Sequence, residues 1–156
     1  MQVWSAFLFV STASAFSLWK SVFRRGSERA VADPICLLPG DPSLTLITNV
    51  DIGDKKSELL KGLSDAIVAS TGKPESYVAV AVLDNSSMMW GGSSEVPMAL
   101  CTLNSLGAVN LENNGKLQAS ITSLLEPFGV VPTKIYTTFN DISRENMGYD
   151  GKTFAG

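Results

Sequence analysis

The sequence predicts an α+β domain made of two β-α-β units, with a four-stranded mixed sheet that carries both helices on one face. Segments rich in β-forming residues alternate with two stretches of helical periodicity. Each predicted helix ends at a glycine and the chain resumes after a proline, a weak internal repeat formed by Gly72-Lys73-Pro74 and Gly129-Val130-Val131-Pro132. With 156 residues, 45% apolar and 17% charged, the chain can bury one core.

The first unit begins with a strand at 43–48, where β-forming residues partly alternate with polar ones. Asp54 is expected to cap a helix over 55–70, which Gly72 ends and Pro74 prevents from resuming. A second strand over 77–83 is apolar throughout, so we expect both of its faces to be covered. The apolar face of the helix is formed by Leu59, Leu60, Leu63, Ile67 and Val68.

The second unit follows a short predicted strand at 88–90. A strand over 97–106 leads to a helix that Asn113 and Asn114 are expected to cap. A last strand is predicted over 134–139, and Asp150-Gly151 is typical of a hairpin turn. The helix has its apolar face at Leu117, Ile121, Leu124 and Leu125 and ends at Pro127 and Gly129.

With both helices on one side, the opposite face of the sheet has no cover within the chain, although its strands are apolar. Apolar strand surface favours burial. We therefore expect the domain to associate with copies of itself.

Charge and composition exclude several classes of protein. The net charge is −3, and from residue 42 onward eight basic and twelve acidic residues give −4, which argues against nonspecific nucleic-acid binding. The sequence has no histidine, so Ser-His and Cys-His catalytic couples are impossible. Of the two cysteines, Cys101 lies in an apolar run and is expected to be a buried structural thiol, while Cys36 precedes the predicted domain.

Residues 1–41 resemble a targeting presequence that is removed from the mature protein. An apolar stretch at 3–10 precedes Ala13-x-Ala15, which fits the specificity of signal peptidase. Residues 16–32 are basic and contain serine, as in transit peptides, so the segment resembles the bipartite presequence of algae with complex plastids. Secretion with a short pro-segment is the main alternative, and a membrane-anchoring amphipathic helix is a less favoured one. Either of the first two routes enters the secretory pathway and leaves no membrane anchor after processing.

The remaining chain, residues 42–156, contains a series of motifs in fixed order. They are Pro42-x-Leu-x-Leu-x-Thr48-Asn49-Val50, Thr71-Gly72-Lys73-Pro74-x-x-Tyr77-Val78, Trp90-Gly91-Gly92-Ser93-Ser94-Glu95, Cys101-Thr-Leu-Asn-Ser105-Leu106-Gly107, Ile135-Tyr136, Asp141, Asn146-Met147-Gly148-Tyr149 and Thr153-Phe154-Ala155. Together these motifs resemble those of the macrophage migration inhibitory factor and D-dopachrome tautomerase family. The resemblance implies a homotrimer of pseudo-symmetric subunits, which agrees with the uncovered sheet face.

The resemblance implies that Pro42 is an N-terminal catalytic base. A free proline is a secondary amine, whereas the same nitrogen inside a chain belongs to an amide and cannot accept a proton. An apolar pocket and a nearby cation lower an amine's pKa, so a neutral amine can move a proton on carbon next to a carbonyl. This tautomerisation needs no metal and no cofactor, but the chain must be cut between Asp41 and Pro42.

The family match also assigns substrate-binding residues. Lys73 corresponds to the lysine that pairs with the substrate carboxylate, and Leu106 to the position whose backbone N–H binds substrate. Tyr136 corresponds to a tyrosine supplied by a neighbouring subunit. Thr138 replaces a common asparagine, and Tyr149 replaces a common indole, so substrate preference is expected to differ. Met98 stands at the first position of the family's Cys-x-x-Cys motif, which leaves thiol chemistry without a basis.

These features predict a phenylpyruvate or dopachrome-type tautomerase that acts on small aromatic keto or enol acids. A cytokine-like or regulatory protein that binds a receptor through the same trimeric fold is the second interpretation. A purely structural trimer is the third. The state of the nitrogen at residue 42 separates the first interpretation from the other two.

Overall fold

A four-stranded mixed sheet forms one layer of the part that the computed structural model describes, residues 41–156. The presequence features over residues 1–40, including Cys36, lie outside this part. The strands are β1 (Ser43–Thr48), β2 (Ala79–Leu83), β3 (Ala99–Ser105) and β4 (Ile135–Asp141). In the order β2-β1-β3-β4, β1 pairs parallel with β2 and antiparallel with β3, and β3 pairs parallel with β4. The predicted four-stranded mixed sheet is confirmed.

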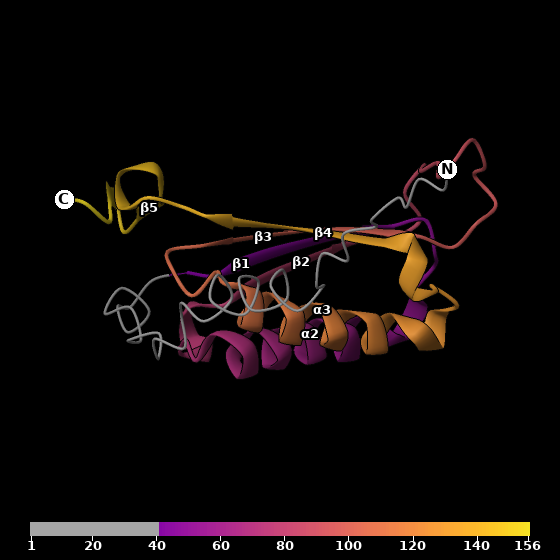
Figure 1. Cartoon of the computed structure of the whole chain (residues 1–156), viewed down its shortest axis with the longest axis horizontal. Helices are drawn as coiled ribbons and strands as arrows, with labels where there is room; N and C mark the ends of the chain where they lie inside the picture. Colours follow the sequence, from indigo (N-terminus) through magenta and orange to yellow (C-terminus); the bar gives the residue numbers. More distant parts are fainter. Residues whose placement is uncertain (1–40) are drawn as a thin grey trace, which may run out of the picture. The chain divides into compact units, whose positions relative to one another are not determined.

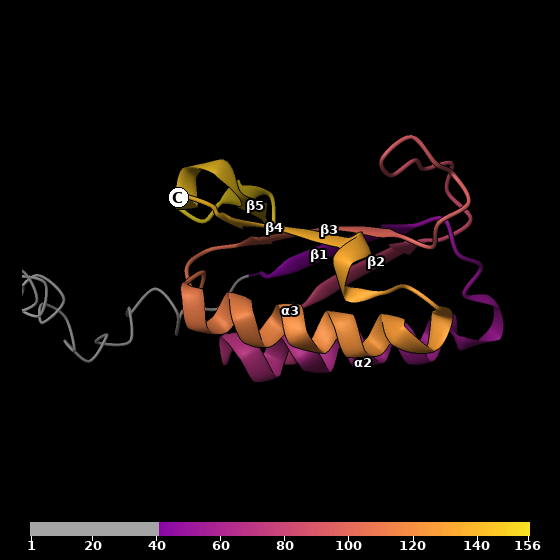
Figure 2. The same cartoon turned by 45° about the vertical axis from the view of Figure 1, so that its right-hand side comes forward.

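Two helices, α2 (Lys56–Thr71) and α3 (Leu111–Leu125), lie side by side on one face of this sheet, as predicted (Figures 1 and 2). Gly62 lets them approach closely, because a Cβ atom there would lie 2.7 Å from Cδ2 of Leu124. Leucines and isoleucines fill the space between helices and sheet, and full burial of each such side chain contributes about 1.5–3 kcal/mol. The core includes Leu44, Leu46, Leu59, Leu63, Ile67, Leu103, Leu117, Ile121 and Leu125.

The predicted end of α2 is confirmed, whereas both helix starts differ from prediction. The helix α3 ends at Leu125, before the predicted Pro127 and Gly129, because the 3-10 helix η4 (Glu126–Phe128) follows it and Gly129 ends η4 instead. Gly72, at φ +72°, ends α2 in the left-handed conformation that favours glycine. Asp54 does not cap α2, because it lies inside the short 3-10 helix η2 (Gly53–Lys55) that precedes α2. The cap of α3 is Asn110, whose extended backbone lets its side-chain oxygen accept the Asn113 N–H at 2.9 Å. The predicted caps Asn113 and Asn114 therefore lie inside the helix.

Short elements account for the other differences in boundaries. The strand predicted from residue 77 begins at Ala79, because η3 (Glu75–Tyr77) comes first. The strand predicted at 88–90 is absent from the described chain, where Trp90 forms only an isolated bridge with Ser93 across two glycines. The C-terminal hairpin pairs β5 (Gly148–Tyr149) with β6 (Lys152–Thr153) around the predicted turn. The other 3-10 helices are η4 (Glu126–Phe128), η5 (Pro132–Lys134) and η6 (Arg144–Asn146).

The sheet face opposite the helices is open in the single chain. The expectation that β2 is covered on both faces is wrong in the single chain, because no second layer covers the open face and the alternate residues of β2 that lie on it are exposed. Leu83, Leu100 and Tyr136 expose 48%, 44% and 66% of their surface. This apolar surface is the one from which the sequence predicts self-association.

Cys101 is buried, as predicted, with 2% of its surface exposed. Burial raises the pKa of its thiol to about 11, so the thiol form prevails at neutral pH. Within residues 41–156, no three side chains of the metal-binding kinds lie close enough to share an ion. No helix in that part combines the length and apolarity needed to cross a bilayer.

Candidate active site

Pro42 occupies a fixed and buried position at the start of β1, a central strand of the sheet. Its carbonyl oxygen accepts the N–H of Ala79 at 2.9 Å, which extends the pairing of β1 with β2 by one step. On the other side of β1, Ser43 is opposite Asn104 of β3. The sheet therefore holds Pro42 beside the carboxyl end of β3.

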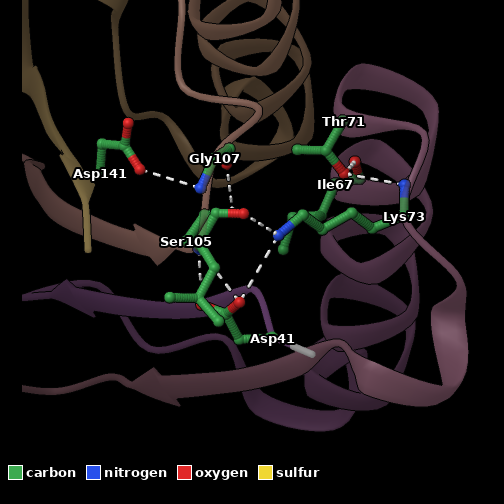
Figure 3. A network of polar contacts seen from close by, with 8 residues as sticks. Asp41, Ile67, Thr71, Lys73, Ser105, Gly107 and Asp141 are labelled. Carbon is green, nitrogen blue, oxygen red and sulfur yellow. Dashed lines mark hydrogen bonds and ion pairs between the residues drawn. The ribbon is translucent and has the colours of Figure 1, made fainter. Parts of the chain in front are cut away.

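Lys73 reaches the same place from the end of α2. The left-handed turn at Gly72 ends the helix, and the backbone N–H of Lys73 donates to Thr71 Oγ1 at 3.3 Å. The Lys73 side chain is 1% exposed, and its Nζ donates to the carbonyl oxygen of Leu106 at 2.7 Å (Figure 3). Lys73 is therefore a buried cation directed toward the end of β3, not a solvated loop lysine.

The loop that follows β3 is held by two hydrogen bonds, one within the loop and one to the end of β4. Ser105 Oγ donates to the carbonyl oxygen of Gly107 at 2.8 Å, and the Gly107 N–H donates to Asp141 Oδ1 at 2.8 Å (Figure 3). Asp141 is the last residue of β4 and is paired with Ser105 in the sheet. This arrangement fixes the backbone of Leu106, whose carbonyl oxygen faces Lys73 and whose N–H faces Asp41, the residue just before Pro42.

The carboxylate of Asp41 fills the space between Lys73 and the Leu106 peptide. Its two oxygens accept the Leu106 N–H at 3.1 and 3.2 Å, and Oδ1 lies 3.5 Å from Lys73 Nζ (Figure 3). The Asp41 side chain is 8% exposed. Its burial raises the pKa of the carboxyl above the ordinary value, against the opposing effects of the Leu106 N–H and Lys73. Together, an ammonium group and a backbone N–H form a binding site for a carboxylate.

An open cleft of about 390 Å³ lies beside Pro42, within the usual size range of small-molecule sites. Aromatic rings form much of it: Tyr77 and Tyr149 meet edge to face at 6.2 Å between centroids, and Tyr149 stacks on Phe154 at 5.8 Å. Its lining residues are Asp41, Pro42, Ser43, Ser76, Tyr77, Val78, Ala79, Met147, Gly148, Tyr149 and Phe154. The cleft offers an apolar, aromatic surface next to the carboxylate-binding group.

The single chain brings together some of the predicted site residues and leaves others apart. Pro42, Lys73 and Leu106 converge at one end of the sheet. Tyr136 and Thr138 lie on β4, exposed on the open face, and neither lines the cleft. Tyr136 pairs with Leu100 of β3, and the centroid of its ring lies 4.4 Å from the centroid of the Trp90 ring.

Sequence reasoning missed four residues at this site. Tyr77 and Phe154 lie inside matched motifs, but the resemblance assigns them no role in the site. Their aromatic side chains within these motifs are the signal that could have identified them. Asp41 was considered only as the residue before the cut, and Asp141 only as a matched position. Nothing local in the sequence indicates that Asp41 reaches Leu106, which lies 65 positions away.

Comparisons with known proteins identify a family for this chain. A family model described as macrophage migration inhibitory factor matches residues 41–155. The macrophage migration inhibitory factor of Meriones unguiculatus is 34% identical over 115 residues, which cover 73% of this chain and 99% of that protein.

Solved structures with the same arrangement include two eukaryotic examples. The macrophage migration inhibitory factor from Toxoplasma gondii matches with a TM-score of 0.67 and 31% identity, covering 72% of this chain and 99% of that one. The structure from Trichinella spiralis matches with a TM-score of 0.65 and 30% identity, covering 72% and 99%. The described fold and the sequence comparison thus point to one family.

Proposed function

The chain belongs to the macrophage migration inhibitory factor family, and we propose that it is a keto-enol tautomerase of aromatic acids of the phenylpyruvate and dopachrome type. Family membership supports isomerase activity in general. The observation that carries the more specific proposal is the pair formed by the buried Lys73 ammonium and the Leu106 N–H, which bind a carboxylate one residue away from Pro42.

Pro42 is the proposed general base, after a cut between Asp41 and Pro42. The cut converts its nitrogen from an amide into a secondary amine. An ordinary terminal amine has a pKa of about 7.7–8.0, and a neighbouring cation and apolar surroundings both favour the neutral form. The neutral amine would remove a proton from the carbon next to the substrate carbonyl, and the carbonyl oxygen would gain a proton to give the enol. The net change moves one proton from carbon to oxygen, and the reverse reaction returns it to carbon through the protonated amine.

Each part of an aromatic keto acid has a matching group at the site. Lys73 and the Leu106 N–H would hold the carboxylate by charge-assisted hydrogen bonds. The ring would lie in the cleft lined by Tyr77, Tyr149 and Phe154. The carbon next to the carbonyl would then face the Pro42 nitrogen. The proposed reaction uses no metal and no cofactor.

We propose further that the working form is a homotrimer, in which Tyr136 and Thr138 of one subunit complete the pocket of the next. Both residues are exposed on the open sheet face and stand apart from the cleft of their own chain. The apolar side chains exposed on the same face support its burial against another copy. The shorter Thr138 side chain, where the family often has asparagine, would alter substrate preference.

Processing and localisation are part of the same proposal. Residues 1–41 would be removed as a presequence, through the secretory pathway, to the exterior or to the complex plastid of an alga. The match of the family model to residues 41–155 supports a domain that begins near this boundary.

A binding function without catalysis is the second candidate, and one observation favours it for the uncut chain. While the bond between Asp41 and Pro42 is intact, the Pro42 nitrogen is an amide and the carboxylate site holds Asp41. A chain that is never cut there would be limited to a cytokine-like or regulatory role through its surface, including binding of a protein receptor.

Mass spectrometry of the protein purified from its natural host tests the proposal. The expected mature N-terminus is Pro42, and that form should tautomerise phenylpyruvate in an absorbance assay. A mature chain that begins at residue 16 or 32, or a chain beginning at Pro42 that lacks this activity, would contradict the catalytic proposal.

A further inference from the structure

We infer that Asp41 is an internal substrate mimic, whose carboxylate occupies the substrate-carboxylate subsite until the chain is cut after it. The inference rests on the proposed function, because that function assigns the subsite to Lys73 and Leu106. The uncut chain would then be inactive for two reasons. The Pro42 nitrogen is an amide and cannot act as a base, and Asp41 prevents a substrate carboxylate from binding.

The contacts of Asp41 are those expected of a bound ligand. Both of its oxygens accept the Leu106 N–H, at 3.1 and 3.2 Å, and the Lys73 ammonium lies 3.5 Å from one of them. The Asp41 and Lys73 side chains are 8% and 1% exposed. The contact is therefore shielded from water, unlike the other ion pairs in the described residues, which include at least one partner above 40% exposure.

The covalent spacing of Asp41 also matches that of the proposed substrate. Between its carboxylate carbon and the Pro42 nitrogen lie Cβ, Cα and the carbonyl carbon. In a 2-oxo acid that gives up a proton from C3, the atoms between the carboxylate carbon and the base are C2, C3 and the moving proton. The two chains of atoms have the same number of links, so a carboxylate held at this subsite places C3 near the base.

The backbone conformation of Asp41 indicates that Leu106 and Lys73 hold this residue in place. Asp41 has a φ of +21°, which non-glycine residues adopt rarely. Such conformations persist where the surrounding structure determines them. The hydrogen bonds to Leu106 and the ion pair with Lys73 supply that determination.

A tethered carboxylate is hard to displace with a free one. A group attached through a short linker competes at an effective concentration on the order of millimolar. Dissolved substrate below this range would not enter the subsite of the uncut chain. One cut between Asp41 and Pro42 would remove the mimic and create the base together, so that binding and catalysis begin at the same event.

The test measures binding in the full uncut chain, where turnover is absent, by titration calorimetry at pH 7. The probes are 3-phenylpropanoate, which lacks the reacting carbonyl, and the uncharged 3-phenylpropanamide. Mass spectrometry before and after each titration verifies that the bond at Asp41 is intact. Asp41→Ala should bind 3-phenylpropanoate at least tenfold more tightly than the unchanged chain, without a comparable gain for the amide. Asp41→Asn, which loses the charge but keeps an acceptor for the Leu106 N–H, should show a smaller gain.

Matched variants locate the effect. Asp54→Ala removes an exposed carboxylate elsewhere in the sequence and should bind the probe like the unchanged chain. Adding Lys73→Met to Asp41→Ala should abolish the gain. Asp41→Asn serves where alanine impairs folding, because it keeps the size and an acceptor for Leu106 while removing the charge.

The outcomes separate this inference from the proposed function. Equal affinity, or no detectable binding, in the unchanged chain and in both Asp41 variants would overturn the internal mimic even if the chain beginning at Pro42 is an active tautomerase. Tighter carboxylate binding by the Asp41 variants, with an inactive chain from Pro42, would support the mimic and reject the tautomerase.

Discussion

Lys73 Nζ donates to the carbonyl oxygen of Leu106 at 2.7 Å, and this bond joins the end of α2 to the end of β3. The backbone N–H of the same residue, which belongs to the preceding peptide group, donates to the carboxylate of Asp41. One lysine therefore supplies charge to the site and also orients the backbone donor beside it. Loss of its charge should affect carboxylate binding more than the fold as a whole.

In the chain that begins at Pro42, Lys73→Met should raise the KM for phenylpyruvate at least tenfold. Hydrogen bonds to charged groups contribute about 1.5–3 kcal/mol, and the methionine side chain preserves most of the buried apolar volume. Steady-state kinetics with phenylpyruvate and with its uncharged methyl ester would measure the difference. An equal rise for both substrates would argue against pairing of Lys73 with the carboxylate.

Pro42→Gly, again in a chain beginning at residue 42, should lower kcat/KM for phenylpyruvate by about 100-fold or more, within the usual range for loss of general-base catalysis. Glycine still provides a terminal amine, but a primary and more mobile one. Sedimentation should show the same oligomer as the unchanged chain. Full activity in this variant would exclude Pro42 as the base.

Asp141→Ala should lower the free energy of unfolding by about 1 kcal/mol, because the Gly107 N–H loses the acceptor that lies 2.8 Å away. Urea unfolding of the two chains would measure this change. Asp141→Asn retains an acceptor oxygen at the same position and is expected to recover much of the loss. Equal stability of all three chains would show that this bond does not support the loop.

Leu100→Glu should dissociate the proposed homotrimer, because it places a charge in the middle of the open sheet face, where Leu100 is 44% exposed in the single chain. Analytical ultracentrifugation would report the mass. Leu111→Glu is the matched control, since Leu111 at the start of α3 is 92% exposed and away from that face. Identical trimers from both variants would remove the open face from the interface.

Cys101 should make stability depend on pH in the alkaline range. Burial raises the pKa of its thiol from 9.0 to about 11, so the unfolded chain loses this proton first. The thiol's contribution to stability is fully present below the unfolded-state pKa of 9.0, and it is lost as the pH rises toward the folded-state pKa of about 11. Urea unfolding between pH 8 and 11 should show a steeper decline for the unchanged domain than for Cys101→Ala. Parallel declines would contradict the raised pKa.

Local patterns predicted most of the fold. The helical spacing of Leu59, Leu63 and Ile67 gave α2 its buried face, and Gly72 was correctly expected to end it. Helix starts were less accurate, because a short 3-10 helix before α2 displaced Asp54 from the capping position. Patterns of residue type indicate which face is buried, whereas a cap depends on the backbone angles of a single residue.

The candidate site was predictable only in part. Lys73 and Leu106 could be assigned because each lies in a matched motif. Asp41 could not, because its partners lie far along the chain and only the sheet register brings them together. Likewise, the exposure of β2 follows from the absence of a second layer on the open sheet face of the single chain, which the apolar sequence of the strand does not reveal.

The position of Pro42 bears on how a newly cut chain would behave. Chain ends usually fray, since few contacts restrain their first residues. Pro42 is instead followed at once by a strand bonded on both sides, and its own carbonyl is held by Ala79. Cleavage before Pro42 would create a terminal amine while the backbone that carries it stays bonded in the sheet. The proposed catalytic group would therefore be as well ordered as an interior residue, although it lies at a chain end.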